Sequence, residues 1–223
     1  LQPCSHLNQS AIATGEWLQK QNIKPSECLI MNSLPLHHIS GLMPWWRSKV
    51  WKARHQWINP EIMKSPNELV QFCKPIFAKS TSKLITSLVP TQLIRLIKNP
   101  TGENWLKNFD LIWIGGATLP SHIRKYALSK KIRLAPCYGA TETSSMVTSL
   151  SPTEFLKGVQ GSGSPLKDVQ LSVDKENVLS IRTPCLAIGR WREGELEPLL
   201  NENKWWKSGD LAEITQNNNS FEL

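Results

Sequence analysis

Apolar and polar residues follow helix-like and strand-like spacing in turn along the first half of the chain. Near the amino terminus, apolar or small residues recur on one face of a predicted helix. The short apolar run 28–34 ends at Pro35, which predicts a buried strand. The residues of the predicted helix face are Leu7, Ala11, Thr14 and Leu18.

Prolines and cap residues mark the starts of further helices. Ser65 is a favourable cap residue, Pro66 takes the first helical position, and Glu68 follows the cap by three residues. Pro75 is expected to bend or end that helix. The other predicted elements are strands over 83–89, 111–114 and 132–134, a helix over 90–97 that stops near 99–102, and a helix that begins at Pro120 and Ser121.

Strands that alternate with helices indicate an α/β fold with a mainly parallel sheet and flanking helices on both faces. Beyond Gly158 the helical spacing fades, and short alternating runs predict a small antiparallel, β-barrel-like subdomain. We therefore divide the chain into an α/β sheet subdomain over 1–157 and a β subdomain over 158–223. The alternating runs are 169–173 and 178–182, residues 211–214 are strand-like, and a turn is expected at Asn217–Asn219.

The composition is that of an ordinary globular protein, and the net charge bears on which classes of molecule the protein could bind. A formal charge of +8 fits anionic partners such as nucleotides or coenzyme A, although the basic residues are dispersed and a solvated surface explains them equally. The five cysteines are widely spaced without a C-x-x-C pair, which favours a reducing, cytoplasmic compartment. No apolar run approaches the roughly 18 residues of a membrane span.

The segment Tyr-Gly-Ala-Thr-Glu-Thr at 138–143 carries the clearest chemical signal. It follows a predicted strand, where parallel sheets bind ligands. Tyr138 offers a flat face to a base, and Gly139 permits close approach of the backbone. Thr141 offers a hydroxyl to a phosphate, and Glu142 offers hard oxygens to Mg²⁺. A strand-to-helix turn capped by a threonine is the structural alternative, and the two interpretations can hold together.

Three other segments are weaker on their own. Gly115-Gly116-Ala117 follows a predicted strand and could pass close to a ligand, although a tight turn explains it as well. Ser208-Gly209-Asp210 offers a carboxylate suited to ribose hydroxyls, or forms a simple turn. Leu34–Gly41 places two adjacent histidines in a loop, and because neighbouring side chains diverge, a zinc site is disfavoured. Serine-hydrolase and Walker-type motifs are missing from the sequence.

Taken in order, these four segments resemble the adenylate-forming superfamily of acyl- and aryl-CoA ligases, luciferases and peptide-synthetase adenylation domains. The resemblance spans essentially the whole chain, and Ser5-His6-Leu7-Asn8 is similar to the segment that follows the family's phosphate loop. The four segments are Leu34–Gly41, Gly115–Ala117, Tyr138–Glu142 and Ser208–Asp210, the last with serine where threonine is more usual.

The resemblance implies a role for each matching residue. Thr141 is expected to contact the α-phosphate, Glu142 to coordinate Mg²⁺, and His38 to border the acyl and phosphate region. Tyr138 is expected to stack on adenine and Asp210 to hold the ribose hydroxyls. The other expected cofactor-binding residues are Gly115, Gly116, Ala117 and Gly139, whereas Gly161 and Gly163 match a structural turn.

Within the superfamily the chain most resembles the o-succinylbenzoate–CoA ligases of menaquinone and phylloquinone synthesis. His38-Ile39-Ser40-Gly41 is followed by Trp46-Arg47. In those enzymes an arginine at this offset looks like the partner of the substrate's aromatic carboxylate, which a planar guanidinium can hold through two N–H donors. Ser40 and Arg47 are therefore expected to face the substrate. A surface position for Arg47 is the alternative.

The implied reaction converts a carboxylic acid and ATP, with Mg²⁺, to an acyl-adenylate and then to a coenzyme A thioester. Positioning and charge neutralisation carry the first step. The family's lysine-bearing phosphate loop is expected before Leu1, and its hinge and C-terminal domain after Leu223. The fragment by itself is therefore expected to bind nucleotide weakly and not to turn over. The sequence does not determine the oligomeric state, and a homodimer is one possibility.

Three alternatives stay open. One is a ligase for another aryl or fatty acid, or a domain that loads a carrier protein, although an apolar acyl chain does not suit an unpaired guanidinium. Another is a basic, non-catalytic binding module. The ten tryptophans could stack on bases, but they lie mostly in apolar contexts that packing explains, so no nucleic-acid partner is expected. The third is a degenerate remnant that keeps the fold without activity.

Overall fold

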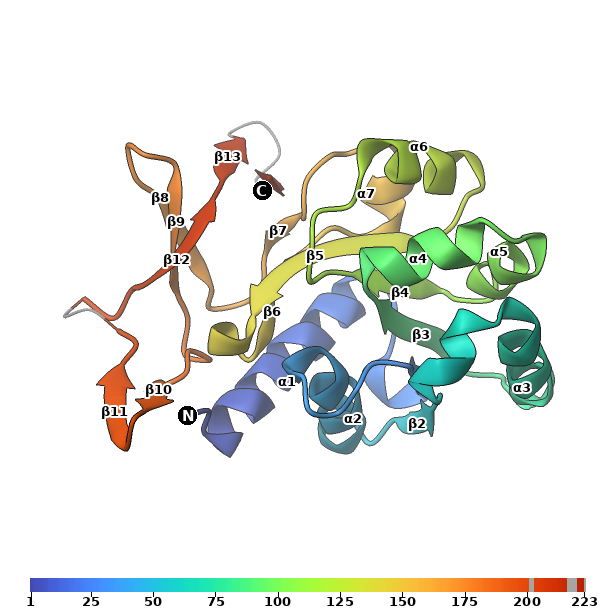
Figure 1. The fold of residues 1–223 in the computed structure, drawn as a ribbon, viewed down its shortest axis with the longest axis horizontal. Coiled ribbons are helices and arrows are strands. Elements are labelled where there is room, and N and C mark those ends of the chain that lie inside the picture. The colour runs from blue at the N-terminus through green and yellow to red at the C-terminus, as the bar shows by residue number, and fades with distance from the viewer. Residues whose placement is uncertain (201–202, 216–219, 223) are drawn as a thin grey trace.

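The computed structural model describes residues 1–200, 203–215 and 220–222, and a seven-stranded sheet forms its centre (Figure 1). From edge to edge the strands are β2 (Arg54–Trp57), β1 (Cys28–Asn32), β3 (Lys83–Leu88), β4 (Leu111–Ile114), β5 (Leu134–Ala140), β6 (Ser145–Ser149) and β7 (Ser164–Pro165). Strands β1 to β5 run parallel, whereas β6 pairs antiparallel with β5 and with β7. The predicted mainly parallel sheet is confirmed.

Helices cover both faces of this sheet. The helices α1 (Cys4–Lys20) and α2 (Ile39–Trp51) pack on one face. The opposite face is covered by α3 (Pro66–Lys79), α4 (Pro90–Ile97), α5 (Pro100–Leu106), α6 (Ser121–Ser129) and α7 (Pro152–Leu156). Three short 3-10 helices, η1 (Pro25–Glu27), η2 (Pro60–Lys64) and η3 (Thr141–Thr143), lie in the connections. None of the helices in the described ranges has the length and hydropathy that a membrane crossing requires.

Two hydrophobic cores result, because successive strand residues point to opposite faces. In β1, Leu29 and Met31 join the core under α3 to α6, whereas Cys28 and Ile30 join the core under α1 and α2. All four side chains are buried. A strand buried on both faces reads as a continuous apolar run, which is why the sequence predicts it without any alternation.

The later part of the chain forms small antiparallel sheets. One contains β8 (Gln170–Val173), β9 (Val178–Arg182) and β12 (Trp206–Leu211), with β9 in the middle. Two hairpins pair β10 (Gly189–Arg192) with β11 (Glu195–Pro198), and β13 (Glu213–Thr215) with β14 (Ser220–Glu222). The boundary at residue 158 stays a prediction, and β7 still pairs within the central sheet. The turn expected at Asn217–Asn219 lies outside the described residues.

Several local expectations differ from the structure. Helix α3 continues through Pro75, which is exposed, so water can satisfy the carbonyl left without an intrahelical donor. The helix expected to stop near 99–102 does end there, but a second helix, α5, begins at once. The Asn99 side chain accepts a hydrogen bond from Thr101 N at 2.8 Å and caps α5. The strand expected over 132–134 begins only at Leu134 and runs to Ala140.

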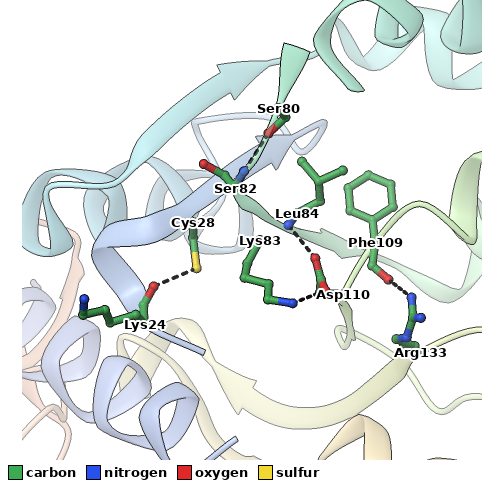
Figure 2. A network of polar contacts seen from close by, with 9 residues as sticks. All are labelled: Lys24, Cys28, Ser80, Ser82, Lys83, Leu84, Phe109, Asp110 and Arg133. Atoms are coloured by element: carbon green, nitrogen blue, oxygen red, sulfur yellow. Dashed lines mark hydrogen bonds and ion pairs between the residues drawn. The ribbon is translucent and has the colours of Figure 1, made fainter. Parts of the chain in front are cut away.

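Polar contacts fix the amino-terminal edge of the parallel strands (Figure 2). The Asp110 carboxylate accepts hydrogen bonds from Lys83 Nζ at 3.0 Å and from Leu84 N at 2.9 Å. Beside it, Arg133 donates to the carbonyl of Phe109 at 3.0 Å. These contacts hold the starts of β3, β4 and β5 together. The cavities described below lie at the opposite edge, where the parallel strands have their carboxyl ends.

Replacing Glu103 with glutamine is expected to destabilise the fold at neutral pH. Its carboxylate accepts hydrogen bonds from Lys107 at 2.5 Å and from Tyr126 at 2.6 Å, and these contacts lower the pKa of Glu103 below its ordinary value of 4.5. Because the pKa is lower in the folded state, the stabilisation is present above about pH 4.5 and is lost as the pH falls. Urea unfolding should show a loss of about 2 kcal/mol at pH 7 and much less at pH 3.

The matched control is Glu61→Gln. Its ion pair with Lys64 is equally short, at 2.6 Å, but both side chains are largely exposed. Exposed pairs of this kind contribute little, so this variant should unfold like the wild type at both pH values. An equal loss at pH 7 and pH 3 for the Glu103 variant would contradict the electrostatic explanation.

Candidate active site

Two cavities open at the carboxyl ends of β4 and β5, the edge at which parallel sheets bind ligands. The first, named here the Tyr138 cavity, has a volume of about 510 Å³. The second, the Arg47 cavity, has a volume of about 430 Å³. Gly116, Cys137 and Gly139 line both cavities, so the cavities adjoin at these residues, which are called here the shared wall.

The Tyr138 cavity gathers side chains from distant parts of the sequence. Gly116 and Ala117 come from the loop after β4, Tyr138 from β5 and Asp210 from β12. The Tyr138 hydroxyl donates to Asp210 Oδ2 at 2.6 Å. Burial and this carboxylate raise the pKa of Tyr138, so its hydroxyl stays protonated at neutral pH. Asp210 therefore presents its carboxylate to the cavity beside an aromatic ring.

Asp210 was expected just before a strand, but it lies within β12. A β-bulge between Lys207 and Leu211 interrupts the pairing of β12 with β9, and Gly209 there has φ +85°. Bulges re-aim side chains. Ser208 Oγ donates to Leu179 O at 3.0 Å and accepts from Asp210 N at 3.1 Å, which fixes the bulge.

A loop that was expected to be only a structural turn forms another side of the Tyr138 cavity. The Arg124 side chain, on α6, donates to the carbonyls of Val159 at 3.0 Å and Gly161 at 2.8 Å. Both Arg124 and Gly161 line the cavity, together with Gln160 and Ser162. Gly161, expected only in a structural turn, therefore also lies at the site.

The Arg47 cavity contains a buried cation. Arg47, on α2, is only 2% exposed, so the alternative of a surface position is wrong. Its Nη2 donates to Ser145 Oγ at 3.2 Å, and its guanidinium carbon lies 5.3 Å from the ring centroid of Trp113. Its Nε is buried and has no hydrogen-bond partner. The guanidinium therefore keeps donor capacity that the protein does not use.

The charge of Arg47 is not balanced by a neighbouring acid. Burial lowers the pKa of Arg47 to about 10, so the side chain stays charged at neutral pH. Across the described parts of the chain, no Asp or Glu forms an ion pair with it. Burial raises the pKa of the neighbouring Cys137 thiol to about 12, so Cys137 supplies no negative charge. A buried charge without a counterion is costly, and an anionic ligand would relieve that cost.

His38, which precedes α2, and Ser40, in the first turn of α2, line the same cavity. The Asn32 side chain at the end of β1 donates to Gly41 O at 2.8 Å and accepts from Leu34 N at 3.2 Å. A Cβ on Gly41 would lie 2.1 Å from the carbonyl oxygen of Pro35, so only glycine permits this close approach. The His38 ring is exposed and packs against His37 with centroids 4.3 Å apart.

The segment at 138–143 was expected to follow a strand. In the structure its first three residues form the end of that strand, β5. Residues up to Ala140 lie in β5, η3 makes a tight turn, and β6 returns antiparallel. The buried Thr143 hydroxyl accepts from Ala140 N at 2.9 Å and donates to Ser145 O at 2.6 Å, which fixes the turn. The turn places Thr141 in the lining of the Arg47 cavity.

Glu142 lies beside Thr141 but outside the lining of both cavities. Its Oε1 accepts from Arg190 Nη2, on β10, at 2.7 Å. Within the described residues, no cluster of three or more His, Cys, Asp or Glu could hold a metal ion. Mg²⁺ usually needs only one or two carboxylates when phosphates supply further oxygens. The single carboxylate of Glu142 therefore fits a Mg²⁺–nucleotide, with Arg190 as a competing cation.

The structure thus brings the predicted residues into two adjoining groups. The Tyr138 cavity is lined by Gly116, Ala117, Tyr138, Gly139 and Asp210. The Arg47 cavity is lined by His38, Ser40, Arg47, Gly115, Gly116, Gly139 and Thr141. Sequence reasoning missed Trp113, Ser145 and Arg124. Trp113 is one member of an apolar strand, and no local pattern distinguishes it from the core.

Comparison with known proteins agrees with the motif resemblance. No protein-family model matches the sequence. The 2-succinylbenzoate–CoA ligase of Escherichia coli (strain K12) is 30% identical over 182 residues, covering 82% of this chain and 36% of that protein. The corresponding ligase of Oceanobacillus iheyensis is 27% identical over 190 residues, covering 82% of this chain and 38% of that protein. The chain therefore spans well under half the length of these relatives.

Two solved structures with this fold are o-succinylbenzoate CoA synthetases. An E. coli o-succinylbenzoate CoA synthetase (MenE) with a bound analogue of OSB-AMS has a TM-score of 0.74 and 27% identity, over 97% of this chain and 43% of that one. The Bacillus subtilis enzyme bound with its product analogue OSB-NCoA has a TM-score of 0.81 and 18% identity, over 99% of this chain and 44% of that one. The predicted resemblance and fold class are confirmed.

Proposed function

We propose that this chain, a relative in sequence and fold of the o-succinylbenzoate–CoA ligases, is the acid- and nucleotide-binding part of an AMP-forming acid–CoA ligase. The proposed substrate is o-succinylbenzoate, with ATP, Mg²⁺ and coenzyme A as the other reactants, in menaquinone or phylloquinone synthesis. Because the chain spans 36% to 38% of the two ligases compared, the proposal concerns the whole enzyme and assigns binding of acid and nucleotide to this part.

The buried guanidinium of Arg47 is the observation that carries the proposal. An acid with two carboxylates can present one for activation and leave the other to be held. Arg47 lies at 2% exposure in a cavity that adjoins the Tyr138 cavity through shared backbone. A guanidinium with unused donors matches a carboxylate in charge and in geometry. A fatty or simple aryl acid would leave that charge buried without a partner.

We assign the nucleotide to the Tyr138 cavity and the acid to the Arg47 cavity. In the Tyr138 cavity, the ring of Tyr138 provides a face for adenine and Asp210 accepts from ribose hydroxyls. In the Arg47 cavity, Arg47 holds the retained carboxylate while the other carboxylate reaches the shared wall, where glycine backbone leaves room for a phosphate. Thr141, at that wall, donates its hydroxyl to the phosphate. This arrangement fixes two reactants in contact, the main source of rate in such a transfer.

Glu142 would hold Mg²⁺ together with the nucleotide phosphates, and the ion supplies neutralisation of the charge that develops on phosphate oxygens. His38, at the border of the Arg47 cavity, is proposed to contact the acyl and phosphate region, with Ser40 facing the acid. Five free cysteines suit a cytoplasmic protein. A homodimer remains a prediction.

The test is calorimetric binding of two non-hydrolysable adenylate mimics to the full-length protein. One carries the o-succinylbenzoyl group, and the other a benzoyl group without the second carboxylate. The dicarboxylate mimic is expected to bind at least about 30-fold more tightly, because charged hydrogen bonds in a buried site contribute about 2 kcal/mol or more. Equal affinities would remove the substrate assignment and leave only the ligase class. Binding of neither mimic would overturn the ligase proposal as well.

A further inference from the structure

Two buried nitrogen donors without partners line the Arg47 cavity. Trp113 is 2% exposed, and its indole Nε1 has no hydrogen-bond partner, as is also true of Arg47 Nε. Both residues line the cavity. Buried polar atoms in folded proteins nearly always have a partner, so each exception requires an explanation. Two exceptions on one cavity point to a ligand with more than one acceptor oxygen.

Trp113 also contacts the cation itself. The guanidinium carbon of Arg47 lies 5.3 Å from the centroid of the Trp113 ring, within the range of a cation–π interaction. Besides Ser145 Oγ, the electron-rich face of the Trp113 ring is in contact with the guanidinium. Since Arg47 has no acidic partner within the described ranges, the ring offsets part of the cost of its burial.

The backbone holds Trp113 firmly in this position. The strand β4 lies between β3 and β5, with Trp113 in register with Ser87 and Ala135. On the side of α1, the Trp113 ring lies 6.1 Å from the ring of Trp17 at an angle of 41°. The indole therefore joins the buried core to the cavity, and its orientation is set by packing on the α1 side.

We propose that Trp113 is a positioning and specificity-determining residue for the dicarboxylate substrate, an inference that rests on the proposed function. Its ring face holds the Arg47 guanidinium in the cavity, and its indole N–H donates to an acceptor oxygen of the same acid. Donors from the strand β4 and the helix α2 contact more than one part of the ligand and hold it in one orientation, whereas Arg47 alone orients only the carboxylate that it contacts. An acid without a second acceptor group gains nothing from Trp113.

The test combines nuclear magnetic resonance with calorimetry on the full-length protein. The Arg47 Nε–H signal, identified by its loss in Arg47→Lys, should be displaced by the ring current of the indole and should move toward the ordinary arginine position in Trp113→Leu. Calorimetry with the two adenylate mimics should show the dicarboxylate affinity falling at least tenfold in Trp113→Leu. In Trp113→Phe, which keeps a ring face but lacks the N–H, the fall should be about threefold to tenfold.

Trp105→Leu is the matched control, because it removes an equally buried indole of the opposite core that does not line the Arg47 cavity. It should leave the Arg47 signal and the preference for the dicarboxylate unchanged, and thermal unfolding should report any general loss of packing in both variants. The proposal is overturned if Trp113→Leu leaves the Arg47 signal in place, if it weakens both mimics equally, or if Trp105→Leu has the same effects.

A wrong proposed function would give a different experimental result from a wrong role for Trp113. In that case the wild-type protein itself shows no preference for the dicarboxylate mimic, and the donor role of the Trp113 N–H falls with it. The Arg47 signal is measured without ligand, so it decides the positioning role independently of the substrate.

Discussion

Replacing Arg47 with alanine should abolish the preference for a dicarboxylate acid. Among the described residues, the buried guanidinium is the one Lys or Arg side chain in the lining of its cavity, and it has no acidic partner. Truncating one partner of a buried charged pair costs about 3 kcal/mol, or about 100-fold in affinity. Calorimetry should therefore show the o-succinylbenzoyl mimic losing at least that factor while the benzoyl mimic changes less than threefold.

Two further variants separate charge from geometry. Arg47→Lys keeps the charge but loses the planar pair of donors, so it should recover only part of the affinity. Arg95→Ala removes an exposed arginine of α4 and should have no effect on either mimic. If the alanine variant at position 47 keeps the wild-type preference, the carboxylate is held elsewhere, and the assignment of the Arg47 cavity is wrong.

Replacing Gly139 with alanine should have the largest effect on stability. A Cβ at this position would lie 2.0 Å from the carbonyl oxygen of Ser145 and 2.4 Å from Met146 Cα, both backbone atoms of β6 that cannot rotate away. The strand β6 must separate from β5, which opens the turn at η3 and the wall between the cavities. Overpacking of this kind costs about 3 kcal/mol or more. Chemical denaturation should show that loss, and binding of either mimic should be lost with it.

Gly158→Ala is the matched control. Gly158 has φ +86°, so alanine there is strained, but nothing lies within 4 Å of the added Cβ. Backbone strain alone should cost about 1 kcal/mol and leave binding intact. A Gly139 variant that is no less stable than the Gly158 variant would mean that β6 does not approach β5 as closely as the structure has it.

The sequence predicted the parallel sheet well because its strands are buried on both faces. A run such as Leu111–Ile114 between a helix end and two glycines permits few other interpretations. The motif segments could also be assigned to a ligand-binding edge, because the carboxyl ends of parallel strands meet there. These inferences depend only on local spacing and on the order of the elements.

The return strand β6 was missed because its apolar residues are mixed with polar ones that become buried. Thr148 and Ser149 are both buried, which no periodicity reports. The burial of Arg47 was left open for a similar reason. An arginine on a tryptophan-rich helix has the same local sequence whether it faces solvent or a cavity, and its surroundings come from Trp113 and Ser145, far along the chain.

The wall shared by the two cavities has a thermodynamic consequence. Gly116, Cys137 and Gly139 line both cavities. A ligand in one cavity therefore restricts the conformation of backbone that a ligand in the other cavity also contacts. On the proposed function, the binding of nucleotide and of acid is then energetically coupled. By linkage, the factor by which nucleotide changes the affinity for acid equals the factor by which acid changes the affinity for nucleotide. Neither dissociation constant is therefore a property of one cavity alone, and each must be stated with the occupancy of the other.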